Sequence, residues 1–261
     1  MPILLTTNQA SPIITASRRN DIEGLSRGVA NFAEDFGTIK DVLHWTLSTE
    51  NFPLQPGLRA TFIGLKNALG DTALNTAARH NRAVFLAALL AAGAYPSVYN
   101  GFGFTALHYA VQNNSEAVTA ILLTHGASPR VRARSGDTPL HIATRSQNLR
   151  ISERLLRKAA PTDWCNAAGD APLHVAVRTG DWPLILQLLN FGAPINQNNR
   201  VNGDTPLHAA VRAWQVDVVE RFLHMGANWR DRNENGLTPY ELARLKGSED
   251  VQAVFLNFGR W

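Results

Sequence analysis

Four histidines could take part in chemistry, because each stands inside nearly the same ten-residue phrase. The phrase reads GDTPLHIATR at 136–145 and GDTPLHAAVR at 203–212. The four residues are His108, His141, His174 and His208. An imidazole in a repeated setting is compatible with a metal ligand, a catalytic base or a structural hydrogen-bonding group. These roles predict three different kinds of protein. The helices and loops that contain the phrase distinguish between them.

The phrase recurs at a regular interval along most of the chain. Its leading glycine lies at 70, 103, 136, 169, 203 and 236, so the spacings are 33, 33, 33, 34 and 33 residues. In each interval the phrase predicts a short first helix, and an apolar segment such as WPLILQLLNFG predicts a second. Most second segments end in Gly-Ala, where a helix C-terminus favours a left-handed residue. The period therefore indicates stacked helix pairs.

The motif TPLHxA, the leucines and Gly-Ala of the second helix and the 33-residue period together resemble the ankyrin repeat over residues 70–261. The resemblance implies an all-α repeat solenoid of stacked helix-turn-helix repeats with protruding β-hairpin loops. The expected repeats lie near 70–102, 103–135, 136–168, 169–202 and 203–235, with a C-terminal cap at 236–261.

Residues 1–69 carry a weaker version of the same pattern. SPIITA at 11–16 and DVLHWT at 41–46 look like worn copies of the first-helix motif. We favour two degenerate ankyrin-like repeats that cap the N-terminal end. A small unrelated helical extension is the alternative.

The repeat argues against metal binding by the histidines. Packed helices lie about 8–10 Å apart, so one histidine per repeat is too widely spaced for zinc, which needs ligands at about 2 Å. We expect each imidazole to bond backbone groups of the adjoining loops and so to join one repeat to the next. No metal and no cofactor is predicted.

No motif points to catalysis. Cys165 lies in the loop segment DWCNAAG at 163–169, where we expect an ordinary thiol. The sequence contains no GxxxxGK[ST], HExxH or GxSxG motif. We expect no catalytic residues and no small-molecule substrate.

Composition limits the possible partners and compartments. The formal net charge is +4, and without a dense Lys/Arg patch nucleic acid is not an expected partner. No apolar run approaches the roughly 20 residues of a membrane-spanning helix, and the N-terminus lacks a standard signal peptide. The single cysteine fits a reducing compartment. We expect a cytoplasmic or nuclear protein that does not bind membranes.

The resemblance implies binding of another protein through the hairpin tips and the concave face of the first helices. The tip positions are Tyr99, Asn100, Phe102, Arg132, Arg134, Asn166, Asn199, Arg200 and Arg232. The concave positions are Arg79, Gln112, Arg145, Arg178 and Arg212. This arginine ladder has two interpretations: it receives an acidic or extended segment of the partner, or its members pair with nearby loop carboxylates.

The function that these observations favour is a non-enzymatic interaction module: a scaffold, adaptor or inhibitor. An alternative is a substrate-recognition or host-directed effector protein that brings a target to separate machinery. An enzyme ranks third, because its site would have to lie within residues 1–69.

Overall fold

The computed structural model describes residue 66, residues 69–91 and residues 93–259. Its helices are numbered α5 to α16 and alternate between two positions in the repeat. The first helices are α5 (Ala73–Arg79), α7 (Ala106–Gln112), α9 (Pro139–Arg145), α11 (Pro172–Thr179), α13 (Pro206–Arg212) and α15 (Pro239–Leu245). The second helices are α6 (Ala83–Ala91), α8 (Glu116–Thr124), α10 (Leu149–Arg157), α12 (Trp182–Asn190), α14 (Val216–His224) and α16 (Glu249–Phe258).

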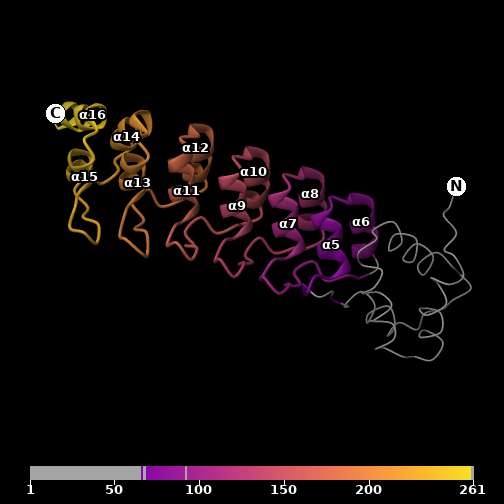
Figure 1. The fold of residues 1–261 in the computed structure, drawn as a ribbon. Coiled ribbons are helices and arrows are strands. Elements are labelled where there is room, and N and C mark those ends of the chain that lie inside the picture. The colour runs from indigo at the N-terminus through magenta and orange to yellow at the C-terminus, as the bar shows by residue number, and fades with distance from the viewer. Residues whose placement is uncertain (1–65, 67–68, 92, 260–261) are drawn as a thin grey trace, which may run out of the picture.

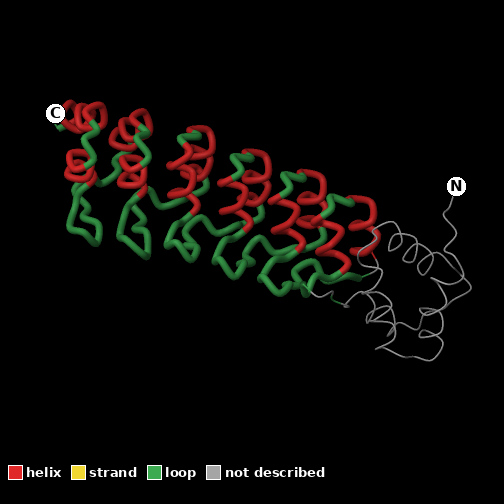
Figure 2. Tube along the Cα trace, in the orientation of Figure 1, coloured by secondary structure: helices red, strands yellow, loops and turns green. Residues whose placement is uncertain are grey.

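The helix pairs stack along one axis into an elongated array (Figure 1). The second helices form one row, the first helices form a second row, and the connecting loops project from the far edge of that second row (Figure 2). Consecutive first helices pack on one another throughout, from α5 against α7 to α13 against α15. This is the repeat solenoid that the period predicts.

Local sequence sets where the first helices begin. The side chain of Thr138 caps α9 by accepting a hydrogen bond from the His141 N–H, and proline follows at the first helical position. Proline suits that position because its missing N–H has no partner there in any case. The second helices end at residues such as Gly126, whose φ of 82° is the left-handed conformation that glycine tolerates.

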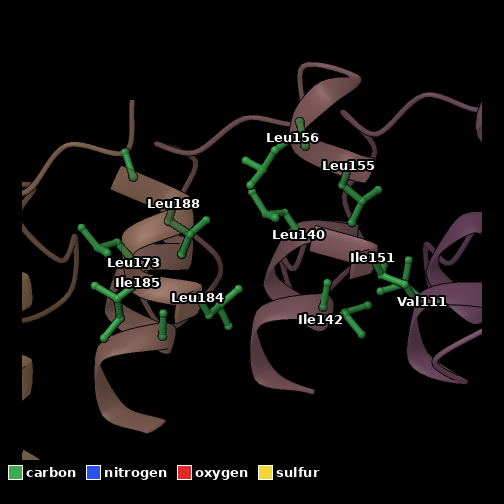
Figure 3. Close-up of a cluster of buried hydrophobic side chains, with 14 of the residues drawn as sticks. Val111, Leu140, Ile142, Ile151, Leu155, Leu156, Leu173, Leu184, Ile185 and Leu188 are labelled. Carbon is green, nitrogen blue, oxygen red and sulfur yellow. The ribbon is translucent and has the colours of Figure 1, made fainter. Parts of the chain in front are cut away.

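The core is one continuous apolar layer between the two rows of helices. Small residues of the first helices, such as Ala143 and Ala176, are fully buried and allow neighbouring repeats to approach closely. Leucines and isoleucines fill the remaining space, with Leu140, Leu155 and Leu184 fully buried. Figure 3 shows the apolar side chains of the α9–α10 pair, such as Leu140 and Leu155, beside those of the α11–α12 pair, such as Leu184. Because the core is shared between neighbours, each repeat depends on the next for its burial.

Each loop ends in a hairpin turn that backbone hydrogen bonds close. In the loop between α10 and α11, the Asn166 N–H donates to the carbonyl of Asp170 at 2.9 Å. Neighbouring loops are joined as well: the Ala167 N–H donates to the carbonyl of Ser135 at 2.9 Å. Within the described ranges these hairpins contain no assigned strand, and one isolated bridge joins Lys66 and Thr72. The loops therefore form a hydrogen-bonded edge without becoming a sheet.

The expected N-terminal repeats at 1–69 lie outside the described residues, apart from positions 66 and 69. At the other end, α15 and α16 complete the array, and Glu241 occupies the place of the repeated histidine. Its carboxylate accepts a hydrogen bond from the Thr238 N–H at 2.8 Å, so this last repeat retains the capping arrangement.

Candidate binding surface

The four histidines sit at the junctions between repeats. Nε2 of His141 lies 2.9 Å from the carbonyl oxygen of Asp170 in the next repeat. On the other side of the ring, Nδ1 accepts from the Thr138 N–H at 3.2 Å. The same pattern recurs for the other three, whose Nε2 atoms lie 2.9–3.4 Å from the carbonyl oxygens of Asp137, Asp204 and Leu237. Each imidazole thus bridges two repeats through backbone groups.

This geometry keeps the imidazoles neutral. Because Nδ1 accepts a backbone N–H and Nε2 faces a carbonyl oxygen, the ring must carry its single proton on Nε2. Burial lowers the pKa of all four histidines, and that of His108 falls to about 4. Both nitrogens of each ring are engaged and all four rings are fully buried, which leaves none of them placed to accept a substrate proton.

The arginines of the ladder are paired with aspartates of their own repeat. Arg145, Arg178 and Arg212 reach Asp137, Asp170 and Asp204, with closest N–O distances of 3.1, 2.5 and 2.5 Å. Arg79 and Asp71 form a longer pair of 3.8 Å. These aspartate side chains are at most 13% exposed, whereas the arginines are 36–54% exposed. The guanidinium groups therefore neutralise the charge of buried carboxylates in their own repeats.

A third residue completes each set. The Asn199 amide donates to Asp170 Oδ1 at 2.6 Å, and its own carbonyl oxygen accepts the backbone N–H of Val201 at 2.7 Å. Asn100, Asn166 and Asn233 make the equivalent bonds to the aspartate of the preceding repeat at 2.7–2.8 Å. An Asp–Arg–Asn set thus connects a first helix, its own loop and the next loop.

The two repeats without the aspartate show that the set acts as a unit. Phe104 and Leu237 stand at the aspartate position, and Gln112 and Leu245 stand at the arginine position. In the first of these repeats Ala133 also replaces the asparagine. Among the six repeats that the structure describes, the arginine is present only where its buried carboxylate is present. This co-occurrence favours pairing with loop carboxylates as the main role of the ladder.

The structure corrects two of the expected tip contacts. Asn100 and Asn199 are buried, with 8% and 4% of their surface exposed, because they hold the hairpin turns from inside. Asn166 is partly buried in the same role. These asparagines belong to the framework of the loops, and the sequence alone did not separate them from their exposed neighbours.

The remaining tip residues are exposed. Tyr99 and Phe102 are 45% and 55% exposed in the loop between α6 and α7. Arg132, Arg134 and Arg200 are exposed in the next loops. Arg232 is also exposed, but it pairs with Glu241 at 2.9 Å. Aromatic and arginine side chains are the types that contribute most at protein interfaces.

Arg130 and Trp164 were not singled out from the sequence; Arg130 is exposed and Trp164 is half-buried. Arg130 and Arg132 approach the ring of Trp164 in the following loop, with guanidinium carbons 5.9 and 4.4 Å from its centroid. The signal for Arg130 was the alternation in PRVRARSG, where Val131 and Ala133 are buried between exposed arginines. The contact with Trp164 depends on stacking of adjacent loops, so no local pattern announced it.

Cys165 is buried beneath these loops. Burial raises the pKa of its thiol, against the opposing effects of Arg200, Gln197 and Arg132. The thiol lies within hydrogen-bonding distance of the Asp163 carbonyl and the Gln197 amide. A buried thiol with a raised pKa is a poor nucleophile.

Within the ranges that the structure describes, no group of three His, Cys, Asp or Glu side chains is placed to hold a metal ion. Over the same ranges, every helix is too short or too polar to cross a bilayer.

Comparison with known proteins agrees with this architecture. The family model for ankyrin repeats (3 copies) matches residues 33–133, 120–192 and 173–259. Among solved structures, the chain is similar to the ankyrin repeat domain of Bcl-3, described as a unique member of the IkappaB protein family. The two are 24% identical with a TM-score of 0.69, over 94% of this chain and 97% of that one. At this identity the likeness shows the fold alone. No curated protein matches the sequence.

Proposed function

Because this chain belongs to the ankyrin repeat family, whose arrays are generally protein-protein interaction modules, we propose that it is a non-enzymatic scaffold, adaptor or inhibitor that binds a partner protein along its loop tips. The observation that carries the proposal is the contrast between buried polar side chains, which stabilise the array, and exposed ones at the loop tips. The four buried histidines, the paired aspartates and the loop asparagines such as Asn199 are hydrogen-bonded internally, whereas aromatic and arginine side chains of consecutive loops face solvent.

The exposed tip aromatics support protein binding in particular. Tyr95, Tyr99 and Phe102 lie on one loop and are 79%, 45% and 55% exposed. Exposed aromatic side chains often contribute to interaction sites, because their burial against a partner removes apolar surface from water. The half-exposed edges of Arg145 and Arg178 would extend this surface onto the concave face, with their aspartates still bound.

The test is affinity capture from the native lysate with the full chain as bait. We compare the wild type with a Tyr99→Ser/Phe102→Ser variant, which removes two exposed tip aromatics. Val84→Ser/Leu256→Ser is the matched control, since both residues are exposed apolar side chains on second helices. We expect one set of proteins to be retained by the wild type and the control and lost from the tip variant.

Identical capture by all three baits would contradict binding through the tips. Circular dichroism melts of each bait check that the fold is intact, and exposed positions are expected to change stability by only about 0.5 kcal/mol.

A further inference from the structure

We propose that an extended, carboxylate-rich segment of the partner protein binds the arginine–tryptophan patch, which we define as Arg130, Arg132, Arg134, Trp164 and Arg200. The inference rests on the proposed protein-binding function and names the chemistry of the partner. It also moves the expected acidic contact away from the concave ladder and onto the tips of three consecutive loops.

The loops that carry the patch have more exposed positive than negative charge. The arginines of the concave ladder already compensate buried aspartates, whereas Arg130, Arg132, Arg134 and Arg200 form no ion pair within the described residues. In the three loops that carry the patch, Asp137, Asp170 and Asp204 are buried and paired. Asp163 is the remaining carboxylate of these loops, and it is exposed. These three loops therefore carry four exposed guanidinium groups and one exposed carboxylate.

The three loops of the patch lie close together. The Ala167 N–H donates to the carbonyl of Ser135 at 2.9 Å and the Arg200 N–H to the carbonyl of Gly169 at 3.0 Å, so each loop is fastened to its neighbour. Gln197 also bridges to the Asp163 carbonyl at 2.6 Å. The patch is thus continuous across the loops.

Arg130, Arg132 and Arg134 alternate with the buried residues Val131 and Ala133. The three arginines therefore form a row of exposed cations along one loop. An extended segment presents every second side chain on one face, so acidic residues at alternate positions would bring successive carboxylates to this row. Arginine binds carboxylates with two parallel hydrogen bonds.

Trp164 contributes by holding the arginines in place. Arg132 stacks 4.4 Å from the ring centroid, and a guanidinium that is already positioned loses less freedom on binding. The same stacking favours a peptide over a nucleic acid, because the arginines occupy ring surface that a base would need. The net charge of +4 is also small for a nucleic-acid-binding protein.

The experiment measures binding of a short fluorescent peptide of alternating Glu and Ser to the full chain, by anisotropy at low and high salt. A peptide with Gln in place of Glu and an oligouridylate of equal length are the comparison probes. The test variant is Arg132→Gln/Arg134→Gln/Arg200→Gln. The matched control is Arg150→Gln/Arg154→Gln/Arg157→Gln on α10, which removes the same charge from exposed positions, with Arg150 and Arg157 80% and 71% exposed.

We expect salt-sensitive binding of the Glu peptide, about tenfold weaker in the tip variant and nearly unchanged in the control, since exposed charge contacts contribute modestly each. Three results would overturn the inference: no binding of the Glu peptide to the wild type, equal weakening by the control variant, or tighter tip-dependent binding of the oligouridylate. If the peptide fails while Tyr99→Ser/Phe102→Ser still abolishes protein capture, the acidic-segment inference falls and the interaction function stands. If the peptide binds but no protein is captured through the tips, the proposed function falls instead.

Discussion

Nε2 of His141 lies 2.9 Å from the carbonyl oxygen of Asp170, a residue 29 positions further along the chain and in the next repeat. The same imidazole accepts the Thr138 N–H that begins its own helix. One side chain therefore caps a helix and ties that helix to its neighbour. Three other repeats contain the same arrangement, which makes the histidine column a main link between repeats.

Replacing His141 with alanine is expected to destabilise the array by about 1–3 kcal/mol, because two buried backbone groups lose their partner. His141→Asn should cost less. Asn75 stands at the same position in the repeat at 70–102, and its amide donates to a different carbonyl of the following loop, that of Val98, at 3.3 Å. Urea unfolding of the full chain measures both variants, with the exposed His125→Ala as the control. Equal stability of the three variants would contradict the linking role.

Stability should fall with acid through the histidine range. The folded pKa of His108 is lowered to about 4, so the unfolded chain binds more protons below pH 6.5 and stability rises with pH over this window. The contribution is fully present above pH 6.5 and is lost as pH falls towards 4. It is about 3 kcal/mol for His108, at about 1.4 kcal/mol per pKa unit.

Unfolding midpoints between pH 7.5 and 4.5 test this dependence. His108→Asn should flatten the curve, because asparagine does not titrate. A wild-type curve that stays level across this window would show that the buried histidines are protonated at little cost.

Neighbouring asparagines at one loop tip should behave differently. Asn199→Ala is expected to cost about 1–3 kcal/mol, because it removes bonds to the carbonyl of Ala168 and to Asp170 Oδ1 from inside the hairpin. Asn198 is exposed, so Asn198→Ala should change stability by less than about 0.5 kcal/mol. Thermal melts of the two variants, side by side, measure the difference. Similar melting points would return Asn199 to the set of candidate contact residues.

Replacing Ala159 with glycine should increase the stability of the array. Ala159 has a φ of 59° at the position where the preceding repeat has Gly126. The left-handed conformation costs an L-residue about 1–2 kcal/mol, and glycine avoids this cost. Part of the gain is lost because glycine makes the unfolded chain more flexible. Ala159→Gly should therefore stabilise the array by about 0.5–1 kcal/mol. Gly126→Ala is the reciprocal variant and should destabilise it, since open space around Gly126 leaves backbone strain as the cost. A lower melting point for Ala159→Gly would contradict this account.

Much of the fold was predictable from the sequence because its determinants are local and repeated. The position of Thr138 before Pro139 sets the start of a helix, and the glycine at 126 sets the end of another. The regular period places His141 and His174 at equivalent points of adjacent repeats, so a role between repeats follows from the pattern alone. The Asp–Arg–Asn set was also legible in principle: where Phe104 replaces the aspartate, Gln112 replaces the arginine.

The surface was decided by the tertiary structure. Arg145 and Arg132 are both arginines at expected contact positions, but the fold of its own repeat places a buried carboxylate beside Arg145, whereas stacking of the loops places an indole ring beside Arg132. Asn198 and Asn199 are adjacent and identical, yet one faces water and the other holds the turn. A period specifies which residues recur, whereas burial and charge compensation depend on side chains that the stacked loops bring together from about one repeat away. The sequence by itself therefore determined the array, and the packing of its loops determined which arginines remain available to a partner.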